Sequence, residues 1–286
     1  MGEEIQGSAR DAQREAHWTK AIPRARDRWQ SRWLVVVVVP ALVLVAVGSC
    51  VGLMLSAPGG LPRFPVVFSV AFAVLVWAMR SATLPAAGVG LLVCLTLSLR
   101  GSGDFFAGPA LSALIALFVL TFVATRFGRR RKEARGLAEA RSGRRASQVV
   151  ANLGVAALCA AVGWYGGCLA ALAEATADTV SSEIGQALGG TTWLITKFRR
   201  VPAGRDGGVS VAGSLAGVVG AGLVVLVGLP GLVRWRDGVV VFVCACAGLA
   251  FDSLLGATVE ERGWLGNDLV NFCSTLFAAG LARLWL

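Results

Sequence analysis

Three acidic residues lie inside a segment that is otherwise apolar enough to cross a membrane. Glu174, Asp178 and Glu183 occur between Ala170 and Gly185, among alanine, threonine and serine residues. A carboxylate at membrane depth is costly, and it usually marks an ion pathway, a metal or a substrate site. Mg²⁺ prefers oxygen ligands and keeps waters or substrate phosphates in its remaining positions. The segment therefore predicts a magnesium site formed by Glu174, Asp178 and Glu183.

The direction of the third carboxylate depends on where the helix ends. Glu174 and Asp178 are four residues apart and share one helix face. Glu183 lies about 140° from Asp178 on an ideal helix. It joins the other two only if the helix breaks near Ser182 or ends near Gly185. A structural polar network, or carboxylates at the membrane interface, is the alternative to a metal site.

A basic, glycine-rich segment follows at residues 197–210. Its lysine and arginines can neutralise phosphates, and its glycines let backbone N–H groups approach an anion closely. Two serines follow where a helix should begin, and a helix N-terminus favours phosphate. The segment is not a Walker loop, and a flexible, positively charged cytosolic loop is the alternative. The residues expected to contact phosphate are Lys197, Arg200, Gly207, Gly208, Ser210 and Ser214.

Two further polar groups occur near the end of the chain. Asp252 lies at the end of an apolar run, and Asn267 and Asn271 are four residues apart on one helix face. Their side chains can bind a base, a ribose or a phosphate, or they can form hydrogen bonds between helices. The chain contains one histidine, His17, so no Ser–His–Asp, Cys–His or zinc set exists. Most hydrolase mechanisms are thereby excluded.

These residues need a membrane-embedded scaffold. The chain has 286 residues, of which 56% are hydrophobic and only 15% charged. Several charge-free runs can each hold a helix of about 20 residues, the length that crosses the hydrocarbon core. The sequence predicts an all-α polytopic bundle of eight or nine spans, with a broken or re-entrant helix at 165–187 as an alternative. The spans are expected near 34–56, 64–80, 82–99, 105–125, 148–164, 167–187, 209–233, 238–257 and 268–285.

The charges indicate how the chain is oriented and divided. The net charge of +10 is explained by the positive-inside rule, because the loop Arg126–Arg145 alone carries nine basic residues. Its expected partners are anionic membrane lipids, and nucleic acid is excluded because no aromatic residues are interleaved. All seven cysteines lie in apolar segments and are expected to be free thiols. The predicted parts are a cytosolic arm at 1–32, an N-terminal bundle at 33–125, a basic cytosolic loop at 126–146 and a C-terminal membrane domain at 147–286 that holds the site.

Three ordered motifs resemble the transmembrane-protein-19 family, also known as domain of unknown function 92. The likeness covers the second half of the chain strongly and the first half weakly. One departure is Leu153, where glycine is expected. The strings that carry the resemblance are Ala175–Gly185, Gly207–Gly217 and Asp252–Ala257, together with Gln148–Asn152 and Asn267–Asn271.

The resemblance implies an activity. Plant members of the family resemble phytyl-phosphate kinases, and the order of motifs is similar to that of dolichol and phytol kinases and, more distantly, phosphatidate cytidylyltransferases, which use CTP. It implies a Mg²⁺-dependent prenyl-phosphate kinase that transfers the γ-phosphoryl of CTP, or another nucleotide, to phytyl or geranylgeranyl phosphate. The alternatives are a CTP-dependent lipid cytidylyltransferase, an isoprenoid alcohol kinase and a non-enzymatic lipid or ion transporter.

The motif matches also assign roles to residues. The catalytic set is Asp178, Glu183, Lys197 and Asp252, and the metal ligands are Asp178, Glu183 and Glu174. The nucleotide- or phosphate-binding set is Arg200, Gly207, Gly208, Ser210, Ser214, Asn152, Asn267 and Asn271. Expected partners are an isoprenoid lipid, a nucleotide and membrane lipids, and a homodimer is left open. In a prokaryotic cell the protein is expected in the plasma membrane, with its N-terminus and active site in the cytosol.

Overall fold

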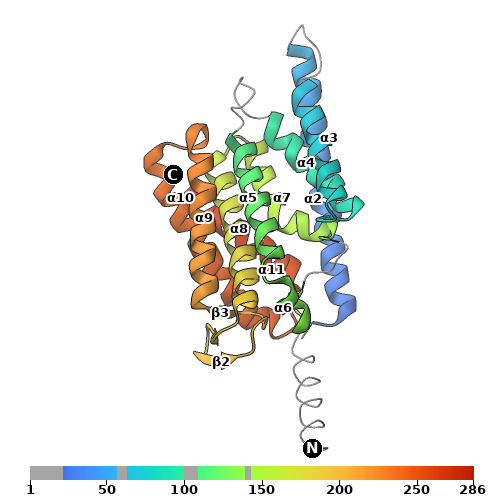
Figure 1. Cartoon of the computed structure of the whole chain (residues 1–286). Helices are drawn as coiled ribbons and strands as arrows, with labels where there is room; N and C mark the ends of the chain where they lie inside the picture. The colour runs from blue at the N-terminus through green and yellow to red at the C-terminus, as the bar shows by residue number, and fades with distance from the viewer. Residues whose placement is uncertain (1–21, 57–62, 100–108, 139–142) are drawn as a thin grey trace, which may run out of the picture.

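The computed structural model describes residues 22–56, 63–99, 109–138 and 143–286, and it is a bundle of helices (Figure 1). Its long helices correspond one for one to the nine expected spans, which confirms the predicted helical membrane fold within the described residues. A short helix, α6 (Arg129–Ala134), lies in the basic loop. The long helices are α2 (Arg24–Ser56), α3 (Arg63–Ala78), α4 (Leu84–Leu99), α5 (Pro109–Arg126), α7 (Ala146–Ala161), α8 (Tyr165–Leu188), α9 (Val211–Leu232), α10 (Trp235–Leu255) and α11 (Asn267–Trp285).

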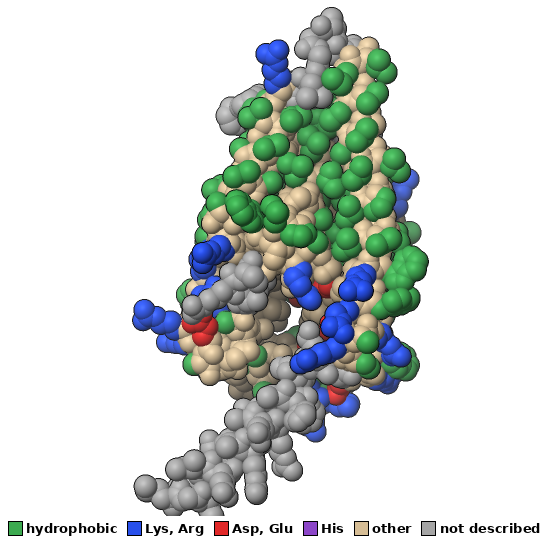
Figure 2. All heavy atoms as spheres, turned by 90° about the vertical axis from the view of Figure 1, so that its right-hand side faces the viewer, with side chains coloured by type: hydrophobic (Ala, Val, Ile, Leu, Met, Phe, Trp, Pro, Cys, Tyr) green, Lys and Arg blue, Asp and Glu red, His purple; other side chains and the backbone are tan. Residues whose placement is uncertain are grey.

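The helices differ in length and in their suitability to cross a membrane. Among the described residues, α2, α9 and the segment Trp235–Glu260 are long and apolar enough to cross a membrane, and α3, α4, α5 and α7 are shorter apolar helices. Figure 2 shows hydrophobic side chains covering most of one face, with Lys and Arg gathered below them around a hollow. This separation is typical of a protein whose apolar band faces lipid and whose basic end faces the headgroups.

Helix α8 is the centre of the bundle. It packs against α5, α7, α9, α10 and α11, and its residues from Gly166 to Ala177 are all buried. Because protein surrounds α8 instead of lipid, the helix can carry acidic and hydroxyl side chains at membrane depth. It is continuous from Tyr165 to Leu188 and is joined to α7 by a short turn at 162–164. The alternative of a broken helix at 165–187 is therefore wrong.

Small residues allow α9 to lie directly on α8. A Cβ atom added to Gly213 would come within 2.6 Å of the Ser181 carbonyl oxygen, and one added to Gly217 within 2.6 Å of the Ala177 carbonyl oxygen. Backbone contact of this kind brings helices closer than larger side chains permit. The close packing fixes the start of α9 beside the acidic part of α8.

The sequence suggested that the basic, glycine-rich segment is a plain loop, but the structure shows strands in it. It supplies two strands, β2 (Arg199–Val201) and β3 (Gly208–Ser210), of a three-stranded antiparallel sheet ordered β2-β1-β3, and the preceding residues supply β1 (Thr192–Leu194). Strands of three residues are too short to produce a readable alternation of apolar and polar residues. The sheet lies at the same end of the bundle as α6 (Figure 1).

The parts expected from the sequence pack together closely. Helix α5 of the first half packs against α8 and α9, and α2 and α4 pack against α7. Residues 1–21 of the expected N-terminal arm, including His17, lie outside the described residues, and its last residues belong to α2. There Ser31 donates a hydrogen bond to Asp268 over 2.6 Å, which ties α2 to the start of α11.

Candidate active site

A polar cavity of about 470 Å³ opens between α8, α9, α10 and the small sheet. Its volume lies within the usual range for small-molecule sites. Segments far apart in the chain form its wall. We call this site the polar cavity. Its polar lining includes Asp178, Ser181, Ser182 and Gln186 of α8, Arg205 to Gly208, Ser210 and Ser214 around β3, and Asp252, Ser253, Glu260 and Asn267 near the end of α10 and beyond.

Two of the expected acidic residues reach this cavity from different helices. Asp178 comes from α8, and Asp252 comes from the last turn of α10. The Ser274 hydroxyl of α11 donates a hydrogen bond to Asp252 Oδ2 over 3.1 Å, which orients that carboxylate. Two acidic side chains from different helices that line one polar cavity suit a bound cation.

Glycine brings the sheet connection against the end of α10. Gly207 has a φ of +70°, and a Cβ atom there would overlap the backbone of Ala257. A Cβ atom on Gly256 would come within 2.6 Å of the Gly207 nitrogen. The backbone at Gly207 and Gly208 therefore forms part of the cavity wall itself. The Gly208 N–H donates to the Arg205 carbonyl oxygen over 2.9 Å, so Gly207 supplies the N–H that can approach an anion.

The first turn of α9 also faces the polar cavity. Ser210 is the N-cap residue, and its side chain accepts a hydrogen bond from the Gly213 nitrogen over 3.1 Å. Ser214 lines the cavity one turn further on. The positive end of the α9 dipole is thus directed toward the cavity, as expected for a phosphate site.

The cations of this segment divide into two groups. Lys197 and Arg200 are exposed on the hairpin of β1 and β2, and neither lines the polar cavity. Arg205 does line it, and it forms an ion pair of 2.6 Å with Glu261. In this structure Arg205, and not Lys197 or Arg200, is the cation placed to meet a ligand there.

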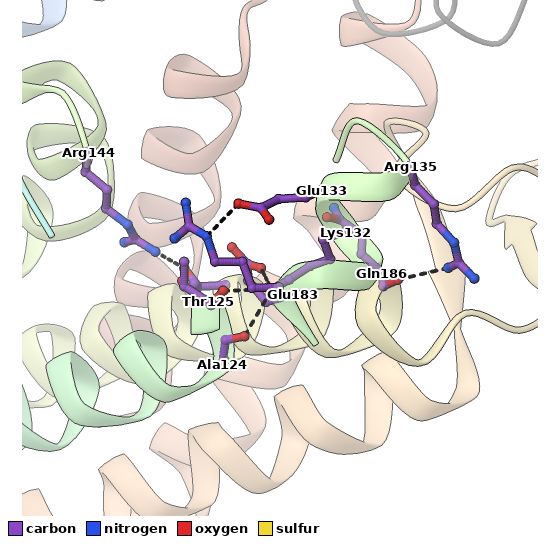
Figure 3. Close-up of polar contacts among 10 residues, drawn as sticks. Ala124, Thr125, Lys132, Glu133, Arg135, Arg144, Glu183 and Gln186 are labelled. Carbon is purple, nitrogen blue, oxygen red and sulfur yellow. Dashed lines mark hydrogen bonds and ion pairs between the residues drawn. The ribbon is translucent and has the colours of Figure 1, made fainter. Parts of the chain in front are cut away.

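Glu183 lies away from the polar cavity. Because α8 continues past it without a break, its side chain leaves the helix on a different face from Asp178. It forms an ion pair with Lys132 of α6, whose ammonium also donates to the carbonyl oxygens of Ala124 and Thr125 over 3.2 and 2.9 Å (Figure 3). The structure therefore gives Glu183 a contact with the basic loop in place of the expected contact with Asp178.

The remaining expected residues are also dispersed. Glu174 is buried on α8 at 1% exposure, does not line the polar cavity, and has one carboxylate oxygen without a hydrogen-bond partner. Asn267 lines the cavity, Asn271 does not, and Asn152 lines a different cavity. Among the described residues, no group of three or more His, Cys, Asp or Glu side chains is arranged to hold a metal.

Two acidic residues of the cavity, Asp206 and Glu260, were not among the expected site residues, whereas Arg205 is one of the arginines expected to neutralise phosphate. Asp206 directly precedes the Gly207–Gly208 pair, and that position was the signal that could have identified it. Glu260 belongs to a single π-helical turn, η2 (Gly256–Glu260), that follows α10. Such turns are frequent at functional sites, but the sequence gives no sign of one here.

Comparison with known proteins places this arrangement in a family. The family described as Integral membrane protein DUF92 matches residues 67–279. An uncharacterized membrane protein of Synechocystis sp. is 37% identical over 184 residues, which are 59% of this chain and 70% of that protein. The Arabidopsis thaliana protein named VTE6, chloroplastic, is 35% identical over 207 residues, which are 66% of this chain and 61% of that protein. No solved structure matches the chain significantly.

The match is not confined to the bacterial and plant proteins. An uncharacterized membrane protein of Methanocaldococcus jannaschii is 35% identical over 182 residues, which are 60% of this chain and 74% of that protein. The matched residues 67–279 run from α3 to α11 and include every segment that lines the polar cavity. The chain belongs to the DUF92 family of integral membrane proteins.

Proposed function

We propose that the protein is an integral-membrane prenyl-phosphate kinase that transfers the γ-phosphoryl group of CTP to an isoprenyl monophosphate. The supporting observation is that three motifs distant in the sequence meet at one cavity: Asp178 of α8, the Gly207–Ser214 segment and Asp252 of α10. The resemblance of plant family members to phytyl-phosphate kinases, together with the relationship to the Arabidopsis protein VTE6, supports this class of reaction.

The donor set of the polar cavity fits Mg²⁺. This ion needs only one or two carboxylates, because waters and substrate phosphates fill its other positions. Asp178 and Asp252 would be the two carboxylates that hold it. When bound, the ion would neutralise charge on the nucleotide phosphates.

The nucleotide phosphates would lie against the glycine and serine wall. The backbone N–H group of Gly207, the first turn of α9 and the Arg205 guanidinium supply the donors. Asn267, which also lines the cavity, has an amide that can contact the base or ribose. Since the acceptor phosphate is already an anion, the reaction needs no strong base, and positioning and charge neutralisation suffice.

The test of this proposal is the fate of the label in CTP. Purified full-length protein is incubated with Mg²⁺ and phytyl, geranylgeranyl or farnesyl monophosphate, and CTP carries radioactive phosphorus at either the α or the γ position. We expect γ-label in an isoprenyl diphosphate. An α-labelled cytidylyl lipid would instead support the cytidylyltransferase, and phosphorylation of the free alcohol would support an alcohol kinase. The same assay with ATP, GTP and UTP defines the donor.

Matched variants connect the reaction to the cavity. Asp178→Asn and Asp252→Asn should each lower turnover by more than about a hundredfold, since substitutions outside the first ligand shell already cost about 10 to 100-fold. Asp237→Asn, at the opposite end of α10, is the control and should keep wild-type turnover. Unchanged turnover in Asp178→Asn, or lipid flux into proteoliposomes without any nucleotide, would contradict the kinase.

A further inference from the structure

A second cavity in the bundle has the opposite charge. It is lined by α3, α4, α5, α7 and the chain before α7, and it measures about 120 Å³. Its charged lining consists of four arginines, with no acidic residue among the described residues that form it: Arg80, Arg126, Arg129 and Arg144. We call it the arginine-lined cavity. The polar cavity, in contrast, contains four carboxylates and one arginine.

The rest of the arginine-lined cavity is apolar. Phe72 of α3 and Phe118 of α5 meet edge to face, with ring centroids 5.2 Å apart, and Leu114 and Leu117 add to this wall. The arginines come from the ends of α3 and α5, from α6 and from the chain before α7. Apolar walls beneath a group of cations match an amphiphile with a negatively charged head and a hydrocarbon tail.

Three of the four arginines have contacts that hold them near the cavity. Arg126 donates to the Met79 carbonyl over 3.2 Å and stacks on Phe122 with its guanidinium carbon 3.4 Å from the ring centroid. Arg129 pairs with Glu133 over 3.1 Å, and Arg144 donates to the Thr179 hydroxyl over 3.4 Å. These contacts orient each of the three guanidinium groups, and the planar fork of N–H donors in a guanidinium suits a phosphate.

A buried polar atom also marks this cavity. Asn152 of α7 lines it and is 7% exposed, and its Nδ2 donates to the Gln148 carbonyl over 2.9 Å. Its Oδ1 has no hydrogen-bond partner. Buried polar atoms are nearly always paired, so this unsatisfied oxygen in a residue of the cavity wall is an exception.

Arg144 links the two cavities. Its guanidinium lines the arginine-lined cavity and reaches Thr179 on α8, and the preceding residue, Asp178, lines the polar cavity. A phosphate held at Arg144 would therefore be close to the acidic end of the proposed nucleotide site. The two substrates of a phosphoryl transfer need this kind of adjacency, with each held by its own set of contacts.

We propose that the arginine-lined cavity binds the isoprenyl monophosphate acceptor, with its phosphate at the arginines and the start of its chain between Phe72 and Leu114. The inference rests on the proposed kinase function and adds the acceptor site to it. The charges of the two cavities decide which of them binds the nucleotide and which binds the monophosphate. A nucleotide carries Mg²⁺ and suits the carboxylates of the polar cavity, whereas a metal-free monophosphate needs cations of the protein itself.

The volume agrees with a head group and the beginning of a chain. A buried water needs roughly 10 to 15 Å³ of cavity volume, so the arginine-lined cavity has room for about ten water-sized groups. This is the size of a phosphate and one isoprene unit. The rest of the chain would leave between the helices into the lipid, so the cavity would select the head and the first unit more strongly than the chain length.

Two glycines of α4 provide a matched pair of variants. A Cβ atom on Gly90 or on Gly88 meets nothing within 4 Å, but only Gly90 lines the cavity, while Gly88 is exposed. Gly90→Leu should fill the cavity without a backbone clash, and Gly88→Leu adds the same side chain outside it. Arg80→Gln removes one lining cation, and Arg131→Gln removes an exposed cation that does not line the cavity.

The experiment measures binding of phytyl monophosphate to the full-length protein in nanodiscs without nucleotide, beside the KM values for acceptor and for CTP. Gly90→Leu should raise the Kd of phytyl monophosphate about tenfold, the equivalent of roughly two methylene groups kept out of an apolar site. Arg80→Gln should raise it severalfold. Both variants should leave the KM for CTP unchanged, and the controls Gly88→Leu and Arg131→Gln should bind as the wild type does.

The outcomes separate this site from the kinase itself. Binding that depends on Gly90 in a protein that transfers no phosphoryl group keeps the site and refutes the kinase. Normal transfer with an unchanged Kd and acceptor KM in Gly90→Leu keeps the kinase and refutes the site. A phospholipid such as phosphatidylglycerol that copurifies in a Gly90-dependent way and is not displaced by phytyl monophosphate would also overturn the proposal, because the cavity would then hold a bilayer lipid.

Discussion

Asp178 and Glu183 show how far one helix can separate two similar residues. Both are acidic residues on α8, but their side chains leave the helix on different faces, and only Asp178 lines the polar cavity. Glu183 meets Lys132, whose side chain is 1% exposed and which also binds two carbonyl oxygens of α5. At the scale of residues, the first carboxylate is placed for a ligand and the second for holding α6 against α8.

This difference predicts opposite phenotypes for two similar substitutions. Glu183→Gln should lower the free energy of unfolding by about 2 kcal/mol, since it weakens a hydrogen bond between charged groups next to a buried ammonium. Its turnover below the unfolding temperature should stay within a fewfold of wild type. Thermal unfolding in detergent and the CTP assay measure the two effects.

A second substitution checks the cause of that loss. Replacing both partners, as in Lys132→Met with Glu183→Leu, removes the unpaired buried charge and should restore most of the stability. If Glu183→Gln abolished turnover while unfolding at the wild-type temperature, Glu183 would act at the site and not in the contact with α6.

At the scale of elements, the small sheet and the π-helical turn form one wall of the site. Gly207 of the sheet connection lies against Gly256 and Ala257, where side chains on the glycines would collide with backbone. This contact holds the Gly207–Gly208 amides beside Asp252. The glycines of this segment thus have a specific role in packing, in addition to allowing the turn.

Two glycines with the same backbone angle allow this role to be tested. Gly136 and Gly207 both have a φ of +70°, but a Cβ atom on Gly136 meets nothing within 4 Å. Gly136→Ala should lower the free energy of unfolding by about 1 to 2 kcal/mol, because alanine is unfavourable in the left-handed conformation. Gly207→Ala should lower the free energy of unfolding further and should also weaken CTP binding, because the sheet must move away from η2.

Unfolding curves and CTP titrations of the two variants provide the comparison. Equal losses of stability, together with unchanged CTP affinity in Gly207→Ala, would show that the packing of the sheet against η2 does not shape the nucleotide site.

At the scale of the whole molecule, the sheet and the basic α6 are at one end of the bundle (Figure 1), and residues 205–210 around β3 line the polar cavity. Arg135 of the basic loop donates to the Gln186 carbonyl over 3.1 Å, and Gly204 lies against Leu137, so the basic loop and the sheet segment touch. The positive-inside rule then favours the cytosol for this whole end. Asp237 and the N-terminus of α10 lie at the other end of that helix from Asp252.

Labelling from the two sides of the membrane tests this orientation. Single cysteines introduced at Lys197 and Arg131 should react with a membrane-impermeant maleimide from the cytosolic side only, and one at Arg236 should react from the opposite side only. Inverted and right-side-out vesicles give the comparison. Reaction of Lys197→Cys and Arg131→Cys from opposite sides would contradict the single basic end of the bundle.

The sequence by itself determined the helices and the acidic side chains that are available for a site. Charge-free runs, some of spanning length and some shorter, predicted most of the nine long helices, because hydrogen bonding in lipid leaves a long apolar segment few alternatives to a helix. Helix α8 was predicted from an otherwise apolar segment that carries three carboxylates. The carboxylates within α8 and at the end of α10 were equally visible, because acidic residues are rare at such positions.

Only the tertiary structure decided which of those residues meet. The sheet was hidden by the shortness of its strands, and the separation of Glu183 from Asp178 followed from α8 continuing to Leu188. Arg205, Asp206 and Glu260 became part of the cavity through the contact of Gly207 with Gly256. Periodicity is a local property of the chain, whereas a cavity depends on how different helices are rotated and packed against one another, so its members can be assigned only after packing is known.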